Sequence, residues 1–196
     1  MPRIGVLALQ GDYAAHAAAL EESGAVASEI RNAHELQSID GLILPGGEST
    51  TMLKFLESHS LFDALREFCQ SKPVFGTCAG AILLAREVLN PPQRSLGLLD
   101  AAIERNAYGR QIDSSIIESE SKLPGGPLEM VFIRAPRIVR IGPQVEALAF
   151  RDHYPTLVRQ GSIMAATFHP ELSTNRLVHQ LFVDQVRFAT SNRGKN

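Results

Sequence analysis

The fold is decided by the stretch Val74-Phe75-Gly76-Thr77-Cys78-Ala79-Gly80-Ala81-Ile82-Leu83-Leu84-Ala85. A short apolar strand precedes Cys78, and strong helix formers follow it from Ala79 to Arg86. Gly76 and Gly80 lie two residues before and after the cysteine, where a Cβ would crowd a tight turn. This pattern is the cysteine form of the nucleophile elbow. We therefore predict a thiol exposed at the carboxyl end of a strand, facing helix N–H groups whose positive charge favours a thiolate.

A buried core position is the alternative for any cysteine, because cysteine is among the most buried residue types. It fits the second cysteine, Cys69, which shares one face of the expected helix Phe62–Gln70 with Leu65 and Phe68. The glycine pair around Cys78 argues against a core position there. We expect Cys69 in the core and Cys78 at a reactive turn.

The composition predicts one domain, residues 1–196, that buries roughly 70% of its unfolded surface. The 19 basic and 21 acidic residues are mixed along the chain, so neither a nucleic-acid stripe nor a polybasic membrane patch is expected. No apolar run approaches the ~20 residues of a membrane span, and no signal peptide is recognised at Met1. Two cysteines cannot form a disulfide framework, which indicates the reducing cytosol. Residues 191–196 are expected to fray.

Apolar runs of strand length alternate with helical patterns in the first half of the chain. The expected strands are Ile4–Leu9, Val26–Ile30, Gly41–Leu44 and Pro73–Phe75, and the expected helices are Tyr13–Glu22, Met52–Glu57 (capped by Ser49–Thr51), Phe62–Gln70 and Ala79–Arg86. Strands that are apolar on both faces are typical of a parallel sheet covered by helices on both sides. We predict an α/β fold of the flavodoxin-like, three-layer α/β/α type. Ligands bind beyond the carboxyl ends of such strands, where Gln10, the Gly46-Gly47 pair and Cys78 fall.

The pattern changes after the elbow. A loop is expected at Asn90-Pro91-Pro92, followed by strand-like pieces at Ala101–Glu104, Ile112–Ile117, Met130–Ile133 and Val145–Phe150. We predict that these pieces form an antiparallel subset at the edge of the main sheet. Ile163–Phe168 is again a fully apolar strand, and a terminal helix that begins at Thr174 or Asn175 follows it.

A cysteine nucleophile needs a base, and the base needs a group that orients it. The sequence His169-Pro170-Glu171 supplies both, because Pro170 keeps His169 extended and residues two apart then point to the same side. Glu171 can accept the Nδ1 proton of His169 and leave Nε2 free for Cys78. The other histidines are assigned to solvated loops: His16, His34, His59, His153 and His179.

Acyl transfer at a thiol also needs N–H donors for the oxyanion. The backbone at Gly46-Gly47 and the N–H of Ala79 are the natural candidates. A glycine pair after a strand also suits a phosphate loop, but no G-x-G-x-x-G and no Gly-Lys-Ser/Thr accompanies it, which disfavours a nucleotide site. Metal-ligand spacing is absent from the sequence as well.

With these motifs the chain resembles the class I glutamine amidotransferases. Three further segments, Leu44–Thr51, Glu104–Gln111 and Phe132–Pro136, are similar to those of one branch, the glutaminase subunits of pyridoxal 5′-phosphate synthases. The resemblance extends from about Ile4 to Phe188. The segments Pro91–Ser95 and His153–Arg159 fit the family pattern least, and no function is assigned to them.

The resemblance implies hydrolysis of L-glutamine to L-glutamate through a γ-glutamyl thioester on Cys78. It implies that the ammonia passes to a separate synthase subunit, which makes the vitamin B6 cofactor from a pentose phosphate and glyceraldehyde 3-phosphate. Neither a cofactor nor a metal is implied for this chain. The residues implied to bind glutamine are Gly47, Glu48, Ser49, Arg105, Ile133 and Arg134.

Two alternatives remain open from the sequence. The chain could be a glutaminase that serves another synthase, such as one of histidine or purine biosynthesis, although the three branch segments argue against it. It could also be a catalytically silent flavodoxin-like module that regulates a partner. The intact Cys78, His169 and Glu171 argue against that second alternative.

Overall fold

The computed structural model describes residues 1–107 and 114–193. Its main sheet has seven strands in the order β10-β11-β12-β4-β3-β1-β2. Their bounds are β1 (Arg3–Leu7), β2 (Val26–Ile30), β3 (Gly41–Leu44), β4 (Val74–Thr77), β10 (Glu146–Arg151), β11 (Tyr154–Gln160) and β12 (Ile163–Ala166). The five strands from β12 to β2 are parallel, and β11 and β10 extend the sheet as antiparallel strands. β4, which leads into Cys78, is therefore a central strand.

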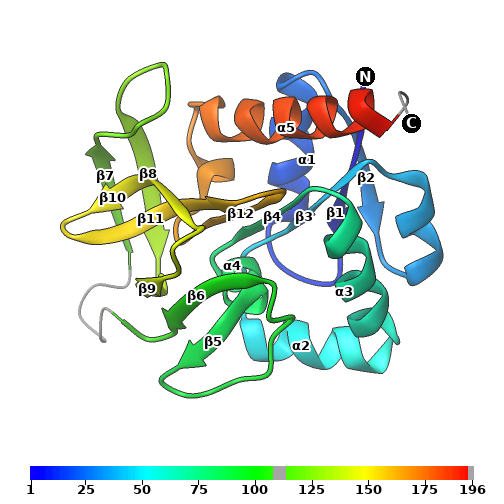
Figure 1. Cartoon of the computed structure of the whole chain (residues 1–196), viewed down its shortest axis with the longest axis horizontal. Helices are drawn as coiled ribbons and strands as arrows, with labels where there is room; N and C mark the ends of the chain where they lie inside the picture. The colour runs from blue at the N-terminus through cyan, green and yellow to red at the C-terminus, as the bar shows by residue number, and fades with distance from the viewer. Residues whose placement is uncertain (108–113, 194–196) are drawn as a thin grey trace.

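Helices cover both faces of this sheet, as Figure 1 shows. α1 (Tyr13–Glu22) and α5 (Leu177–Arg193) lie on one face, and α2 (Ser49–Ser58), α3 (Leu61–Ser71) and α4 (Ala79–Leu84) lie on the other. Two short 3-10 helices, η1 (Ala33–Ser38) and η2 (Pro170–Leu172), are the remaining helical elements among residues 1–107 and 114–193. Each face has its own apolar core, which confirms the predicted three-layer α/β/α fold. Cys69 is buried in one of these cores, as expected.

Two smaller sheets accompany the main one. The first contains β5 (Ala85–Leu89), β6 (Leu99–Glu104) and β9 (Arg137–Ile141), and the second pairs β7 (Ser114–Ser119) with β8 (Leu128–Ile133). The four predicted pieces correspond to β6, β7, β8 and β10, and each pairs antiparallel with a neighbour: β6 with β9, β7 with β8 and β10 with β11. Their predicted place at the edge of the main sheet is correct only for β10, since β6, β7 and β8 belong to the two smaller sheets, where β6 also pairs in parallel with β5. β5, β9 and β11 were not predicted, because these strands are partly exposed and lack a continuous apolar run.

The helix after the elbow is shorter than predicted. α4 ends at Leu84 instead of Arg86, and the chain enters β5 at Ala85. The last helical carbonyls, those of Leu83 and Leu84, accept hydrogen bonds from the N–H groups of Leu96 and Leu98 in the loop before β6. α2 begins earlier than predicted, at Ser49, because the Glu48 carboxylate caps its first turn. These local shifts leave the order of the elements unchanged.

The terminal helix begins at Leu177, later than predicted, because the Asn175 side chain accepts the Leu177 N–H at 2.8 Å and stands outside the helix. It continues to Arg193, so residues 191–193 of the expected tail are helical, and residues 194–196 lie outside the described part. Residues 112 and 113 of the expected strand Ile112–Ile117 also lie outside it. Within the described ranges, no helix has the length and apolar character needed to cross a membrane.

Candidate active site

Cys78 forms the turn between β4 and α4. Its backbone has φ 47° and ψ −102°, a conformation that residues with a Cβ rarely adopt and that is found at strained functional turns. Its N–H donates to the carbonyl of Ala166 on the neighbouring β12 at 2.8 Å, which ties the turn to the sheet. The thiol was expected to be exposed, but Cys78 is only 6% exposed because it lies at the wall of a pocket. The turn is present as predicted, in a more enclosed setting.

The two glycines around Cys78 are required by close packing. A Cβ on Gly76 would lie 2.6 Å from the backbone of Gly80, and a Cβ on Gly80 would collide with the carbonyl of Leu44 at the end of β3. The glycines therefore let α4 approach β3 and β4 closely enough to close the turn. This packing is the physical reason for the spacing seen in the sequence.

His169 and Glu171 pair beside the elbow as predicted, but the segment is not extended as expected, because Pro170–Leu172 forms the 3-10 helix η2 with His169 as its N-cap. His169 follows β12 and donates from Nδ1 to Oε1 of Glu171 at 2.7 Å. Burial disfavours the imidazolium, but hydrogen bonds to Cys78 and Glu171 outweigh burial and raise the pKa of His169 to about 10. His169 and Glu171 are both buried, with 5% and 4% of their surface exposed. The arrangement has the form of a nucleophile, a base and an orienting carboxylate.

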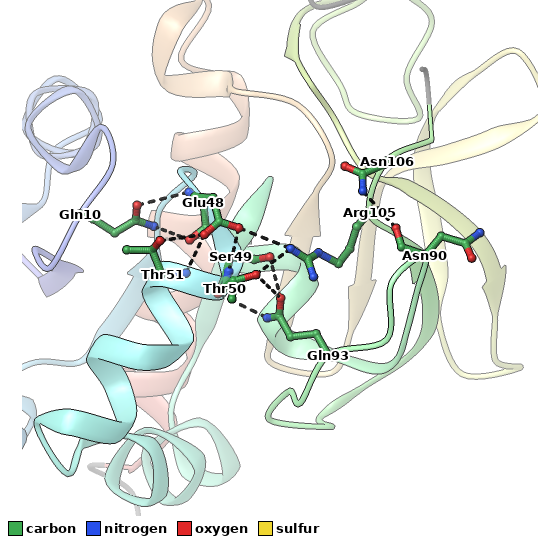
Figure 2. A network of polar contacts seen from close by, with 9 residues as sticks. All are labelled: Gln10, Glu48, Ser49, Thr50, Thr51, Asn90, Gln93, Arg105 and Asn106. Carbon is green, nitrogen blue, oxygen red and sulfur yellow. Dashed lines mark hydrogen bonds and ion pairs between the residues drawn. The ribbon is translucent and has the colours of Figure 1, made fainter. Parts of the chain in front are cut away.

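The Gly46-Gly47 loop lies against this group. A Cβ on Gly46 would lie 2.5 Å from the His169 ring, and Gly47 has a φ of +133°, which side chains rarely tolerate. The Gln10 side chain holds the next peptide: its Nε2 donates to the Glu48 carbonyl at 3.0 Å, and its Oε1 accepts the Glu48 N–H at 3.2 Å (Figure 2). The loop is therefore in place to present a backbone N–H, and its role toward an oxyanion stays a prediction.

A cavity of about 250 Å³ opens above Cys78. All six residues expected to bind glutamine contribute to its wall, as do His169 and Ile82. These six come from the loop after β3, the first residue of α2, the end of β6 and the end of β8. The structure thus brings together segments that are distant in the sequence: Gly47, Glu48, Ser49, Arg105, Ile133 and Arg134.

Figure 2 shows how Arg105 is held at this cavity. Its Nη2 donates to the Thr50 hydroxyl at 2.8 Å and lies 3.4 Å from Oε1 of Glu48. The Glu48 carboxylate also accepts the N–H groups of Thr50 and Thr51 at 3.0 and 2.7 Å. Although burial opposes ionisation, hydrogen bonds from the Thr51 hydroxyl and from the Thr50 and Thr51 N–H groups lower the pKa of Glu48 to about 2. Glu48 is therefore primarily a helix cap and a partner for Arg105.

A metal ligand set is a further possibility at any cluster of acids and histidines. Asp12, His169 and Glu171 place candidate ligand atoms within 4.8 Å of one another. His169 Nδ1 is already engaged by Glu171, and the three residues do not have the spacing of a metal motif. We assign no metal to them, and the absence of a cofactor stays a prediction.

Comparison with known proteins identifies the family. The model of the SNO glutamine amidotransferase family matches residues 6–188. The chain belongs to this family. It is 56% identical over 189 residues to the pyridoxal 5′-phosphate synthase subunit PdxT of Koribacter versatilis, covering 96% of this chain and 98% of that protein. It is 53% identical over 192 residues to the subunit of the same name from Solibacter usitatus, covering 95% and 100%.

A solved structure supports the same assignment. A crystal structure described as a glutamine amidotransferase matches with a TM-score of 0.87 and 43% identity, covering 94% of this chain and 98% of that one. The family segment Glu104–Gln111 is seen only in part, because residues 108–111 lie outside the described ranges. The fold and the glutaminase activity of the SNO glutamine amidotransferase family thus agree with the resemblance found in the sequence.

Two histidines of this SNO family member were wrongly assigned to solvated loops. His16 on α1 and His179 on α5 are both completely buried, whereas His34, His59 and His153 are exposed. His16 lies three and four residues before Ala19 and Leu20, so its place on the apolar face of α1 was visible as helical spacing. The sequence held that signal, although histidine is not itself apolar.

Gln93, in the segment Pro91–Ser95, is a further residue beside the site that the sequence patterns do not indicate. Its Oε1 accepts from the Ser49 hydroxyl at 2.9 Å, and its Nε2 donates to the Ser49 carbonyl at 3.3 Å (Figure 2). Gln93 thereby ties this loop to the first turn of α2, which borders the cavity. A contact across this separation leaves no local pattern in the sequence.

Proposed function

We propose that this chain hydrolyses L-glutamine to L-glutamate and ammonia, as the glutaminase subunit of a pyridoxal 5′-phosphate synthase. Membership of a glutamine amidotransferase family and the names of the relatives support this function. The observation that carries the proposed site is a cavity of about 250 Å³ lined by Cys78 and His169, with Glu171 hydrogen-bonded to His169. The cytosolic location expected from the sequence stays a prediction.

The chemistry follows from that group. The Cys78 sulfur attacks the γ-amide carbon of glutamine, and His169 holds the thiol proton and then delivers it to the leaving nitrogen, so that ammonia departs and a thioester remains. His169 next takes a proton from water, which attacks the thioester and releases glutamate. Glu171 keeps Nδ1 of His169 protonated throughout, so that Nε2 faces the sulfur. We assign the oxyanion to N–H groups at Gly46-Gly47 and Ala79.

Glutamine is selected by the charges at its α-carbon. We assign its carboxylate to Arg105 and Arg134, because a guanidinium matches a carboxylate with two N–H donors. The Glu48 carboxylate is engaged by its own helix, so backbone carbonyls at the cavity are better placed than Glu48 to receive the ammonium group. Ser49 and Ile133 shape the space between these ends.

Replacing Arg105 by glutamine is expected to raise KM for glutamine about tenfold or more, because a charge-assisted hydrogen bond is lost, while kcat changes little. The measurement is steady-state glutaminase kinetics. Arg94→Gln is the matched control: Arg94 pairs with Glu57 at 2.7 Å and stacks on Phe62, away from the lining of the cavity, and should keep the wild-type KM. A wild-type KM in Arg105→Gln would remove Arg105 from carboxylate binding.

The assignment to a synthase predicts that ammonia release is slow in the isolated chain and increases at least about tenfold with the synthase subunit. Gly47 and the Gln10 side chain, which holds the N–H and carbonyl of Glu48, lie at the same sheet edge as Cys78. A partner docked there can therefore fix one conformation of the loop. A shift of ~1.4 kcal/mol suffices for a tenfold change in a rare competent state. Ammonia release is measured for the chain alone and with saturating partner. Equal rates, with the complex shown to form, would contradict this coupling.

The ammonia assay tests the first alternative function, and labelling of Cys78 tests the second. A glutaminase for a different synthase would release ammonia but would not be stimulated by the pyridoxal 5′-phosphate synthase subunit. A silent module would not be labelled at Cys78 by an electrophilic glutamine analogue, whereas a glutaminase would.

A further inference from the structure

A chain of buried polar side chains lies behind the proposed triad, on the side away from the cavity. His16 on α1 is completely buried, and its Nε2 lies 3.1 Å from the Thr77 hydroxyl and 3.3 Å from Oε2 of Glu171. Its Nδ1 lies 3.0 Å from Nε2 of His179 on α5. The His16 imidazole therefore contacts both Thr77, the residue before Cys78, and the carboxylate of Glu171.

The two carboxylate oxygens of Glu171 are held differently. Oε1 accepts the hydrogen bond from His169, whereas Oε2 is buried and has no well-aligned hydrogen bond among the described residues. The N–H group of His16 is placed to face it, at ion-pair distance and without ideal alignment. A buried carboxylate oxygen with no facing donor favours the protonated acid. A protonated Glu171 would not orient His169.

Burial also sets the charge of the two inner histidines. Desolvation lowers the pKa of His16, and desolvation together with His16 lowers the pKa of His179 to about 3, so both are neutral near pH 7. Because an ionised Glu171 only accepts, Nε2 of His16 carries the proton, and His179 donates to Nδ1 of His16. His179 Nδ1 is then the bare nitrogen, in agreement with its lack of a hydrogen-bond partner among the described residues.

The other charged groups near this chain of contacts come from three elements. Asp12, just before α1, raises the pKa of His16, and His169 lowers it. Arg176, just before α5, lowers the pKa of His179. Burial raises the pKa of Glu171, but His16 and His169 outweigh burial and lower it. A neutral His16 has only its N–H dipole, 3.3 Å from Oε2, to favour the ionised carboxylate, and loss of that donor shifts Glu171 toward its protonated form.

We propose that His16 is a positioning residue of the glutaminase reaction, which holds Oε2 of Glu171 and the Thr77 end of the elbow through one neutral imidazole. It acts on the substrate only through Glu171, His169 and Cys78. The proposal rests on the proposed function for its kinetic consequence. It assigns a role to a buried histidine that the chemistry of Cys78, His169 and Glu171 does not itself use.

Two amide variants test which edge of His16 matters. The amide of His16→Gln reaches the place of Nε2, whereas the amide of His16→Asn reaches only the place of Nδ1, beside His179. His16→Met fills a similar space without a donor. We expect His16→Asn and His16→Met to lose roughly tenfold or more in kcat with little change in KM, and His16→Gln to recover most of the loss. All variants are assayed in the complex with the synthase subunit, and thermal unfolding is recorded for each.

The pH dependence supplies a readout that packing alone would not move. In His16→Asn and His16→Met the acidic limb of the kcat profile should shift to higher pH, because Glu171 takes up a proton more easily. The pH dependence of the rate at which iodoacetamide alkylates Cys78 should shift as well. This measurement needs no glutamine. It therefore tests His16 even if the wild-type complex releases no ammonia from glutamine, a result that would overturn the proposed function instead.

Three results would overturn the role of His16. The first is wild-type kcat and an unshifted pH profile in folded His16→Asn or His16→Met. The second is a folded His16→Gln variant that loses as much kcat as the other two. If neither His16→Asn nor His16→Met folds, His16→Gln alone decides. The third result is then a loss of kcat beyond tenfold in a His16→Gln variant that unfolds at the wild-type temperature.

Discussion

Cys78→Ala is expected to abolish glutamine hydrolysis and to leave the fold intact. In the proposed mechanism the Cys78 sulfur forms the γ-glutamyl thioester, so its removal should lower kcat by at least about a thousandfold. Alanine keeps the Cβ that already tolerates a φ of 47° at this turn, so no new backbone strain arises. The measurement is ammonia release, with circular dichroism and thermal unfolding as the test of the fold. Ammonia release at the wild-type rate in Cys78→Ala would contradict the thioester mechanism.

The second cysteine supplies the matched control. Cys69 is buried, and burial raises the pKa of its thiol to about 12, so it is not a thiolate near pH 7. Cys69→Ala should keep the wild-type kcat and lose about 1 kcal/mol of stability through the small cavity it leaves. A loss of activity in a folded Cys69→Ala would show that cysteine replacement as such is disruptive, and it would weaken the interpretation of Cys78→Ala.

His169→Asn is expected to be nearly as damaging as loss of the thiol, while Glu171→Gln costs less. Asparagine cannot take the thiol proton or return it to the leaving nitrogen, so both proton transfers fail. Glutamine in place of Glu171 keeps the shape of the side chain and loses the charge that favours the Nδ1 proton of His169. The order of the two kcat values is the decisive quantity, measured for both variants under the same conditions.

The expected ranking separates proton transfer from orientation. A Glu171→Gln variant with a lower kcat than His169→Asn would remove Glu171 from the role of orienting group. Equal unfolding temperatures of the two variants are required, because both side chains are buried and either change can destabilise the fold. With matched stability, the difference in kcat reports chemistry alone.

The elbow and its partners could be predicted from sequence because their signals are local. Gly76 and Gly80 mark a turn in which neighbouring backbone leaves no room for a Cβ, and His169 and Glu171, which form a hydrogen bond, lie within three residues of sequence. Strands apolar on both faces indicate a parallel sheet wherever they occur. The difference between the predicted and the observed start of α2 also has a local cause. Glu48 acts as its N-cap, a position usually held by Ser, Thr, Asp or Asn.

The sequence by itself therefore determined the α/β class, the strand that ends at Cys78, the likeness to glutamine amidotransferases and the residues expected in catalysis. Only the tertiary structure decided that His16 meets His179 across 163 positions of the chain, and that Gln93 reaches Ser49 across 44. Only it decided that β5 joins β6 in parallel. The physical reason is that backbone preferences depend on adjacent residues, whereas the burial and partners of a polar side chain depend on which distant elements pack against it.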